Sequence, residues 1–193
     1  ILALAVLGIG KGDKVILQVN AYEATAFAIL AAGATPIFVD IEEDANINED
    51  SISKVVDEKT KAIIPVYMYG VCADILRIKK IADNHNLKII EDVCQAHGSQ
   101  VNGRRLGSFG DIGTFSFNPH KNISTLGNGG ALTFNDAGIK EKIYDIIYYD
   151  RENPSLLKIK RPSPKMSFAD MAFLNAKLKA VRVIEENKKN IKE

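Results

Sequence analysis

The sequence has few cysteines and almost no net charge, and these two absences narrow the classes of protein to which it can belong. Its 193 residues include two cysteines, Cys72 and Cys94, which indicate neither a disulfide framework nor a zinc site. A reducing cytoplasm is therefore the simpler expectation. The formal net charge is +1, so nothing in the charge balance points to a nucleic acid or an anionic membrane as a partner.

Long apolar runs and several catalytic patterns are also missing. The apolar opening at residues 1–9 is too short to span a bilayer, and it lacks the basic flank of a signal peptide. The three histidines show no metal-ligand spacing, and no serine nucleophile elbow is present. The run Gly8-Ile-Gly-Lys-Gly12 faintly resembles a dinucleotide loop. We reject it because it follows a helical pattern, whereas that loop joins a strand to a helix.

Short apolar runs alternate with helical patterns, which predicts an α/β domain with a mostly parallel sheet flanked by helices. The length suffices for one domain with a substantial core. The chain opens inside a hydrophobic helical run and stops inside a charged one, so we expect a piece of something longer. A loop is expected at residues 151–164, where three prolines fall. Strands are expected at residues 14–18, 36–39, 62–66, 88–90, 114–117 and 131–134, and helices at residues 22–32, 48–56 and 74–84, from residue 137 and from residue 168.

Chemistry-bearing residues gather in two clusters that follow expected strands. The first is Ile90-Glu-Asp-Val-Cys-Gln-Ala-His-Gly98, and the second is Gly110-Asp-Ile-Gly-Thr-Phe-Ser-Phe-Asn-Pro-His-Lys121, after which comes Leu126-Gly-Asn-Gly-Gly130. Ligands of open α/β sheets bind outside the carboxyl ends of strands. Asp92 lies at such an end and Tyr22 soon follows another strand, so we expect both to face one crevice.

An acid at a strand end, a hydroxyl-rich strand and a lysine before glycines together favour a pyridoxal phosphate site. Lys121 would be the Schiff-base nucleophile, and Asp92 would pair with the pyridinium nitrogen. Ser116 and backbone N–H groups near residues 127–130 would cradle the phosphate, and Tyr22 would stack on the ring. Glu91, on the other face of the strand, is expected to be structural.

Each of these residues also has an ordinary explanation. Most lysines are solvated, although the apolar neighbours of Lys121 weaken that explanation. An aspartate after a strand often caps a loop, a glycine turn is more often a hairpin, and an aromatic at a helix start often belongs to the core.

The motifs resemble those of the DegT/StrS family of pyridoxal-phosphate-dependent nucleotide-sugar aminotransferases over nearly the whole chain. The order and spacing of the segments carry the resemblance more than any one of them does. They are Gly12-Asp-Lys-Val-Ile16, Ala24-Thr-Ala-Phe-Ala28, Gly33-Ala-Thr-Pro-Ile-Phe-Val-Asp40, Thr60-Lys-Ala-Ile-Ile-Pro-Val66, Tyr69-Gly70, Glu91-Asp-Val-Cys-Gln-Ala-His-Gly98, Gly107-Ser-Phe-Gly-Asp111 and Phe115-Ser-Phe-Asn-Pro-His-Lys121.

The resemblance implies that residues 1–193 form the large, cofactor-binding domain of a fold type I aminotransferase, incomplete at both ends. Lys121 matches the Schiff-base lysine, Asp92 the pyridinium partner, and Gln95 the glutamine beside the cofactor's ring hydroxyl. Ser116 matches a phosphate-binding serine, and Tyr22 matches the stacking aromatic. The implied enzyme is a cytoplasmic homodimer. It would transfer an amino group from glutamate or glutamine to a nucleotide-linked keto-sugar, for polysaccharide, glycan or antibiotic sugar synthesis.

The sequence departs from the family pattern in several places. The upstream Gly-Thr loop and the small C-terminal domain are absent, Asn128 replaces a glutamate, and Ser163-Pro-Lys165 stands where the family has Asn-x-Arg. A non-catalytic regulatory or scaffold relative therefore stays an alternative. A sugar dehydratase is a lesser alternative, because that class has histidine in place of the lysine and His120 is next to Lys121.

Overall fold

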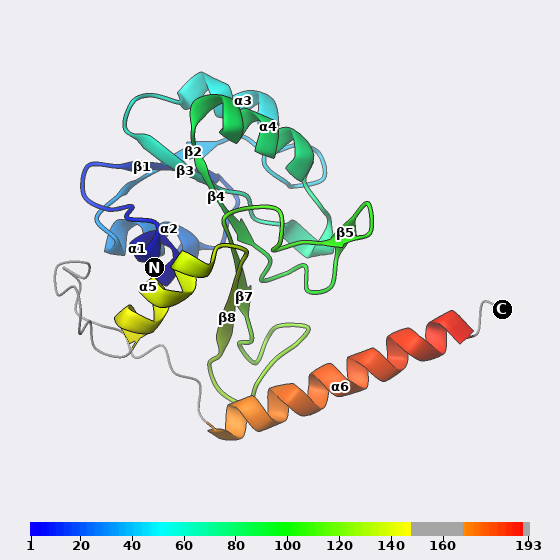
Figure 1. Ribbon diagram of the computed structural model, residues 1–193. Coiled ribbons are helices and arrows are strands. Elements are labelled where there is room, and N and C mark those ends of the chain that lie inside the picture. The colour runs from blue at the N-terminus through cyan, green and yellow to red at the C-terminus, as the bar shows by residue number, and fades with distance from the viewer. Residues whose placement is uncertain (148–167, 191–193) are drawn as a thin grey trace.

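One six-stranded sheet forms the centre of the computed structural model, which describes residues 1–147 and 168–190 (Figure 1). The strand order is β2-β1-β3-β4-β7-β8. Neighbouring strands from β2 to β7 are parallel, and β8 runs antiparallel to β7. The predicted α/β class and mostly parallel sheet are thus confirmed. The strands are β1 (Lys14–Gln18), β2 (Thr35–Val39), β3 (Thr60–Ile64), β4 (Lys88–Asp92), β7 (Ile112–Ser116) and β8 (Gly130–Phe134).

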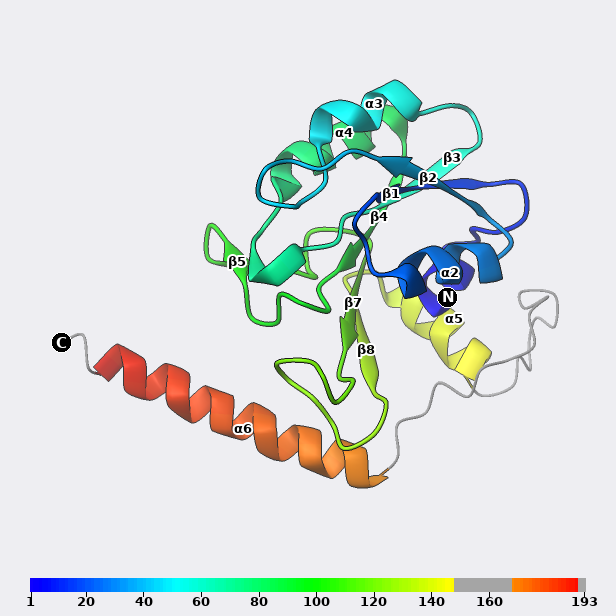
Figure 2. The same ribbon diagram turned by 180° about the vertical axis from the view of Figure 1, so that it is seen from behind.

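Helices cover both faces of the sheet, because successive side chains of a buried strand point to opposite sides. Ile16 and Ile63 pack with α3 and α4 in one core, whereas Leu17 and Ile64 pack with α1, α2 and α5 in the other. Figures 1 and 2 show these two groups of helices on either side of the sheet. The helices are α1 (Leu2–Val6), α2 (Glu23–Ala31), α3 (Glu49–Val55), α4 (Ile75–His85), α5 (Ala137–Ile147) and α6 (Phe168–Asn190), with a 3-10 turn η1 at Met68–Gly70.

The residues that begin and end these helices act as the sequence indicates. Asn48 Oδ1 accepts a hydrogen bond of 3.0 Å from the Ser51 N–H, which confirms the predicted cap of α3. Asp74 caps α4 in the same way. Gly33, after α2, has a φ of +84°, the left-handed conformation that favours glycine at a helix end. Within the described residues, each expected strand and helix is present to within two residues of its expected start or end.

A small hairpin, β5 (Gln100–Val101) and β6 (Arg104–Arg105), was not predicted. Its two-residue turn is Asn102-Gly103, with φ values of 51° and 76°. Both values are positive, as the favoured turn of a two-residue hairpin requires, and Asn-Gly is its usual sequence signal. The signal was present, but the flanking strands are too short to show an alternating pattern.

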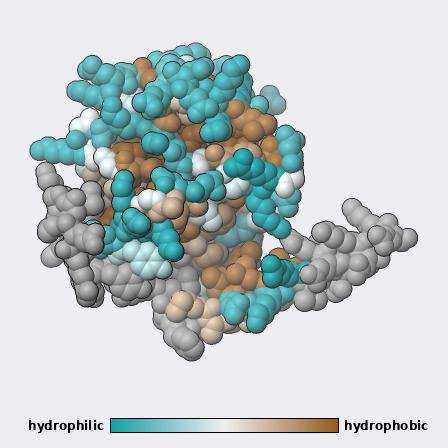
Figure 3. Space-filling model, in the orientation of Figure 1, coloured by the Kyte–Doolittle hydropathy of each residue, from teal (hydrophilic) through white to brown (hydrophobic). Residues whose placement is uncertain are grey.

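The surface of the helical layer formed by α3 and α4 is hydrophilic, as the upper part of Figure 3 shows. On α4, exposed Arg77, Lys80 and Asn84 lie opposite buried Ile75 and Ile78, the arrangement expected of a helix with one face in a core. Within residues 1–147 and 168–190, no helix is both long and apolar enough to cross a membrane. The same residues contain no group of three or more side chains suited to hold a metal ion.

The predicted helix from Phe168 is confirmed as α6. The predicted loop at residues 151–164 and the Ser163-Pro-Lys165 departure lie outside the described residues.

Candidate active site

A cavity of about 540 Å³ opens at the carboxyl edge of the sheet, and its wall includes the five residues whose side chains are predicted to bind the cofactor. Its volume lies within the range of about 300–1,000 Å³ that small-molecule sites occupy. Apolar side chains such as Ile64 and Ile90 form part of the wall. The elements that supply the predicted residues end at one edge because their strands are parallel. These residues are Tyr22, Asp92, Gln95, Ser116 and Lys121.

Asp92 is held rigidly at the end of β4. Asp92 is 9% exposed. Oδ2 accepts a hydrogen bond of 3.2 Å from the Thr25 hydroxyl, and Oδ1 accepts one of 3.1 Å from the Cys94 N–H. The sequence analysis did not assign a role to Thr25, which also lines the cavity. Thr25 lies one helical turn after Tyr22, and that spacing is the signal that could have found it.

Gln95 is oriented by the turn η1. Its Oε1 accepts a hydrogen bond of 3.2 Å from the Tyr69 N–H, and its Nε2 lies 3.6 Å from Met68 Sδ, which is a weak acceptor. The amide oxygen is therefore occupied, and the amide nitrogen is the stronger hydrogen-bonding group left for a ligand.

Lys121 lies in the connection between β7 and β8, which we call the lysine loop (residues 117–129). Its backbone N–H donates to Asn118 O over 2.9 Å, and its side chain is half-buried in the cavity wall. Among the described residues, its Nζ has no hydrogen-bond or ion-pair partner. Ser116 lines the same wall, and its Oγ accepts a long hydrogen bond of 3.4 Å from the Asn118 N–H.

Residues 127–130, predicted to offer an anion nest, do not line the cavity. The Gly127 N–H donates to Asp170 Oδ1 over 2.7 Å, Gly129 O accepts from the Phe117 N–H, and Gly130 pairs with Ser116 in the sheet. The Gly127 N–H thus serves the contact with α6, and Ser116 is the part of the predicted phosphate cradle that lies in the cavity wall.

Glu91 faces away from the cavity and has the structural role that its position on the strand predicts. It is fully buried, and its carboxylate accepts hydrogen bonds of 2.7–2.8 Å from the Tyr67 hydroxyl and from three backbone N–H groups. Burial and the Glu91 charge raise the pKa of Tyr67. The backbone donors belong to Gly107, Phe109 and Gly110.

Two further titratable side chains lie near Asp92. Burial raises the pKa of the Cys94 thiol and lowers the pKa of His97, so both groups favour their neutral forms. The His97 ring packs between Phe115 and Phe117, with ring centroids 5.9 and 5.7 Å away. Both of its nitrogens are buried without a hydrogen-bond partner in the described structure.

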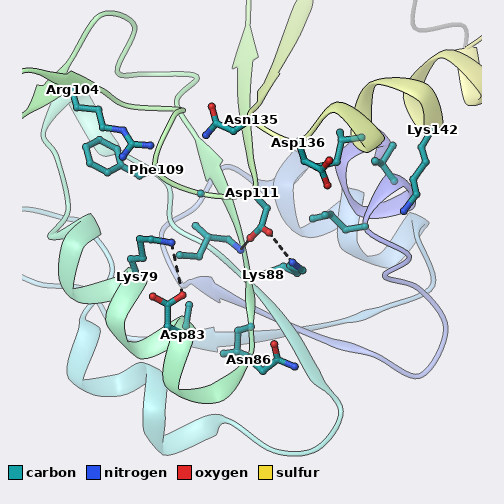
Figure 4. Close-up of a pocket in the computed structure, with 17 residues that line it drawn as sticks. Lys79, Asp83, Asn86, Lys88, Arg104, Phe109, Asp111, Asn135, Asp136 and Lys142 are labelled. Atoms are coloured by element: carbon teal, nitrogen blue, oxygen red, sulfur yellow. Dashed lines mark hydrogen bonds and ion pairs between the residues drawn. The ribbon is translucent and has the colours of Figure 1, made fainter.

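A larger cavity, of about 630 Å³, lies at the opposite edge of the sheet and contains none of the predicted site residues (Figure 4). Four of its charged side chains form two ion pairs. Lys88 and Asp111 are 2.8 Å apart, and Lys79 and Asp83 are 3.8 Å apart. The side chains of these pairs are partly to largely exposed, and ion pairs in contact with solvent contribute little to stability.

The model of the DegT/DnrJ/EryC1/StrS aminotransferase family matches residues 1–192. A UDP-N-acetyl-3-dehydro-α-D-glucosamine 3-aminotransferase of Acidithiobacillus ferrooxidans is 46% identical over 143 residues, which are 74% of this chain and 39% of the relative. A pleiotropic regulatory protein of Geobacillus stearothermophilus is 45% identical over 142 residues, which are 73% of this chain and 38% of the relative.

Solved structures agree with these matches. DesV of S. venezuelae, in complex with a ketimine intermediate, has a TM-score of 0.86 and 35% identity, over 94% of this chain and 49% of that one. NtdA of Bacillus subtilis, with the bound cofactor PMP, has a TM-score of 0.71 and 38% identity, over 76% of this chain and 33% of that one. The chain thus spans less than half the length of each of these proteins.

Proposed function

Because this chain belongs to the DegT/DnrJ/EryC1/StrS aminotransferase family, we propose that it is the cofactor-binding part of a pyridoxal-phosphate-dependent sugar aminotransferase. The observation that carries the proposal is the gathering of Lys121, Asp92, Gln95, Ser116 and Tyr22 in one cavity wall. An amine, a carboxylate, an amide donor, a hydroxyl and an aromatic ring match the groups of a phosphorylated pyridine aldehyde one for one.

Pyridoxal phosphate, when bound, supplies an electron sink that stabilises negative charge developing on the substrate carbon. Lys121 Nζ, which has no ion-pair partner among the described residues, is available to hold the aldehyde carbon and later to move a proton. Asp92, fixed by Thr25 and Cys94, would keep a proton on the ring nitrogen. Because the carboxylate is already oriented, little reorganisation is needed when charge develops.

The remaining residues would orient the ring. Gln95 Nε2 would donate to the ring hydroxyl, since its Oε1 is already used by the Tyr69 N–H. The Ser116 hydroxyl would donate to the phosphate, and the exposed ring of Tyr22, at the start of α2, would cover one face of the pyridine. The apolar wall formed by residues such as Ile64 and Ile90 would exclude water from the reacting side.

We further propose that the whole protein is a cytoplasmic homodimer that transfers an amino group from glutamate or glutamine to a nucleotide-linked keto-sugar. The names of the relatives support a sugar aminotransferase. Residues 1–193 would form its large domain, and the substrate would reach the site from the carboxyl edge of the sheet.

The test is a reductive trap on the purified chain. The protein is incubated with pyridoxal phosphate, reduced with borohydride and digested, and the modified peptide is located by mass spectrometry. We expect one cofactor on Lys121 and none on Lys88, at the other edge of the sheet. Label spread over many lysines, or no label, would count against the cofactor assignment.

A regulatory role is the second candidate, because a relative named as a pleiotropic regulatory protein is almost as similar as the aminotransferase. The same trap separates the two. A purely regulatory protein has no need of a lysine that captures the cofactor, whereas an enzyme of this kind requires it. His120 also lines the cavity, but the dehydratase alternative needs histidine at the position of Lys121, and lysine is present there.

A further inference from the structure

The first turns of α6 lie against the lysine loop, while the rest of this 23-residue helix extends away from the body of the molecule (Figures 1 and 2). The contact uses one face of the helix. Asp170, Leu174 and Lys177 follow the i, i+4, i+7 spacing that places side chains on a single face. Leu174 is buried, and a polar residue stands on either side of it.

Asp170 holds the glycine turn of the loop. Its Oδ1 accepts a hydrogen bond of 2.7 Å from the Gly127 N–H, a charge-assisted bond of the stronger kind. A Cβ at Gly127 would lie 3.2 Å from Asp170 Oδ2, closer than carbon usually approaches a carboxylate. The glycine therefore allows the carboxylate to reach the backbone.

Lys177 contacts the lysine loop at Ser124, which is closer to Lys121 in the sequence than Gly127 is. Its Nζ donates to Ser124 Oγ over 2.7 Å, and Ser124 is buried with 6% of its surface exposed. The same ammonium lies 4.9 Å from the ring centroid of Phe173. Lys179, two residues further along α6, is exposed, so the two lysines make a matched pair for comparison.

Hydrogen bonds link several residues of the lysine loop to one another. The Thr125 N–H and hydroxyl both donate to Phe117 O, over 2.8 and 2.9 Å. Asn118 Nδ2 donates to Asn128 Oδ1 over 3.1 Å, and Asn118 O accepts from the Lys121 N–H. A shift at Gly127 or Ser124 therefore reaches Asn118 and the Lys121 backbone through two or three bonds.

We propose that Asp170 and Lys177, the α6 contact pair, are positioning residues that set the placement of Lys121 from outside the cavity. The part of this inference that concerns the cofactor rests on the function proposed above. The other part of the inference, that the contact pair orders the lysine loop, does not rest on that function, because it applies whether or not a cofactor is bound. Movement of α6 would then change the readiness of Lys121 to capture the cofactor.

Hydrogen exchange of the cofactor-free chain tests whether the contact pair orders the lysine loop. In Lys177→Met and in Asp170→Leu, we expect amides of residues 118–130 to exchange on the order of tenfold faster, as the loss of about 1.4 kcal/mol of protection predicts. Lys179→Met should exchange like the wild type. Asp170→Asn, which keeps a side-chain acceptor, should restore most of the protection, and so should Lys177→Arg. Unchanged exchange in both first variants, or an equal change in Lys179→Met, would overturn the inference.

Cofactor titration tests the second part. For Lys177→Met we expect the dissociation constant for pyridoxal phosphate to rise several-fold while the melting temperature stays near that of Lys179→Met. If Lys177→Met and Lys179→Met bind pyridoxal phosphate with equal affinity while the loop of Lys177→Met exchanges faster, the order of the loop does not govern cofactor capture by Lys121. If the wild-type chain captures no cofactor, the proposed function fails, and the exchange comparison still decides whether α6 orders the loop. If Asp170→Leu fails to fold, Asp170→Asn and the two lysine variants carry the test.

Discussion

The two cavities at opposite edges of the sheet contain similar residue types and differ in how those residues are paired. At the amino edge, lysines and aspartates form exposed ion pairs with one another, such as Lys88 with Asp111. At the carboxyl edge, Lys121 has no such partner among the described residues, and Asp92 is fixed by a hydroxyl and a backbone N–H. Four of the charged side chains in the larger cavity are thus already paired with one another, whereas Lys121 is not paired with an acid in the described part of the chain.

The difference follows from the architecture of a parallel sheet. Loops at the carboxyl edge extend from strand ends toward one crevice, and they can place functional groups at a distance from each other. The amino edge of this chain is closed by short turns and by the ends of α4 and α5, whose charged residues face water. The same substitution made at each edge therefore tests whether a residue acts in cofactor chemistry at the carboxyl edge alone.

The largest expected effect is that of removing the lysine amine. Lys121→Ala should abolish attachment of pyridoxal phosphate to a lysine side chain, because Lys121 is the only lysine among the described residues that line the cavity, and stability should change by less than about 0.5 kcal/mol. Lys88→Ala, at the amino edge, should retain full attachment. Borohydride trapping with intact-mass analysis measures both. Equal attachment in the two variants would remove Lys121 from its proposed role.

Neutralising the aspartate should have the next largest effect. In the chain loaded with pyridoxal phosphate, Asp92→Asn should slow amino transfer from glutamate on the order of a hundredfold or more, as the loss of a preorganised charge does at other sites. Some cofactor binding should persist, because Lys121 is intact. Asp111→Asn is the matched variant at the amino edge, where the transfer rate should not change. Single-turnover absorbance kinetics give the comparison, and an unchanged rate in Asp92→Asn would contradict it.

Glu91 allows the effect of a structural carboxylate to be compared with that of Asp92, the carboxylate of the proposed site. Glu91→Gln replaces one acceptor oxygen by an amide nitrogen, so two buried donors lose their partner. We expect a loss of about 2–6 kcal/mol in unfolding free energy, from about 1–3 kcal/mol for each of the two unsatisfied donors. Tyr67→Phe removes only one donor and should cost about 1 kcal/mol. Urea titration decides, and a smaller loss in Glu91→Gln than in Tyr67→Phe would show that the backbone donors find other partners.

The neighbouring residues Glu91 and Asp92 also show how much the sequence could predict. Strand alternation separated a structural acid from a site acid, and the carboxyl-edge rule placed Asp92 and Tyr22 at one crevice, so the fold and part of the site followed from local pattern. Gln95 was implied by the family resemblance alone. The roles of Gly127 and Thr25 followed from neither. Gly127 is bonded to Asp170, 43 residues away, and Thr25 to Asp92, 67 residues away, and such partners depend on tertiary placement that no local pattern encodes.

The smallest expected effect is a pH dependence behind the carboxyl edge, at His97. Burial lowers its pKa below the ordinary value of about 6.5. The unfolded chain therefore binds more protons than the folded chain between the folded pKa and about pH 6.5. Stability should be complete above about pH 6.5 and should fall as the pH drops through that window, by no more than about 1.4 kcal/mol per pH unit from this one group.

His97→Leu removes this titration and retains an apolar contact with Phe115 and Phe117. Urea midpoints of the two proteins, measured from pH 8 to pH 5, should run parallel above about pH 6.5. Below it the wild-type midpoint should fall relative to that of His97→Leu, since only the wild type loses stability through this imidazole. Curves that stay parallel at every pH would mean that the imidazole gains a partner on protonation. In that case burial of His97 would not make the carboxyl edge more sensitive to pH than the amino edge, where the paired charges are exposed to solvent.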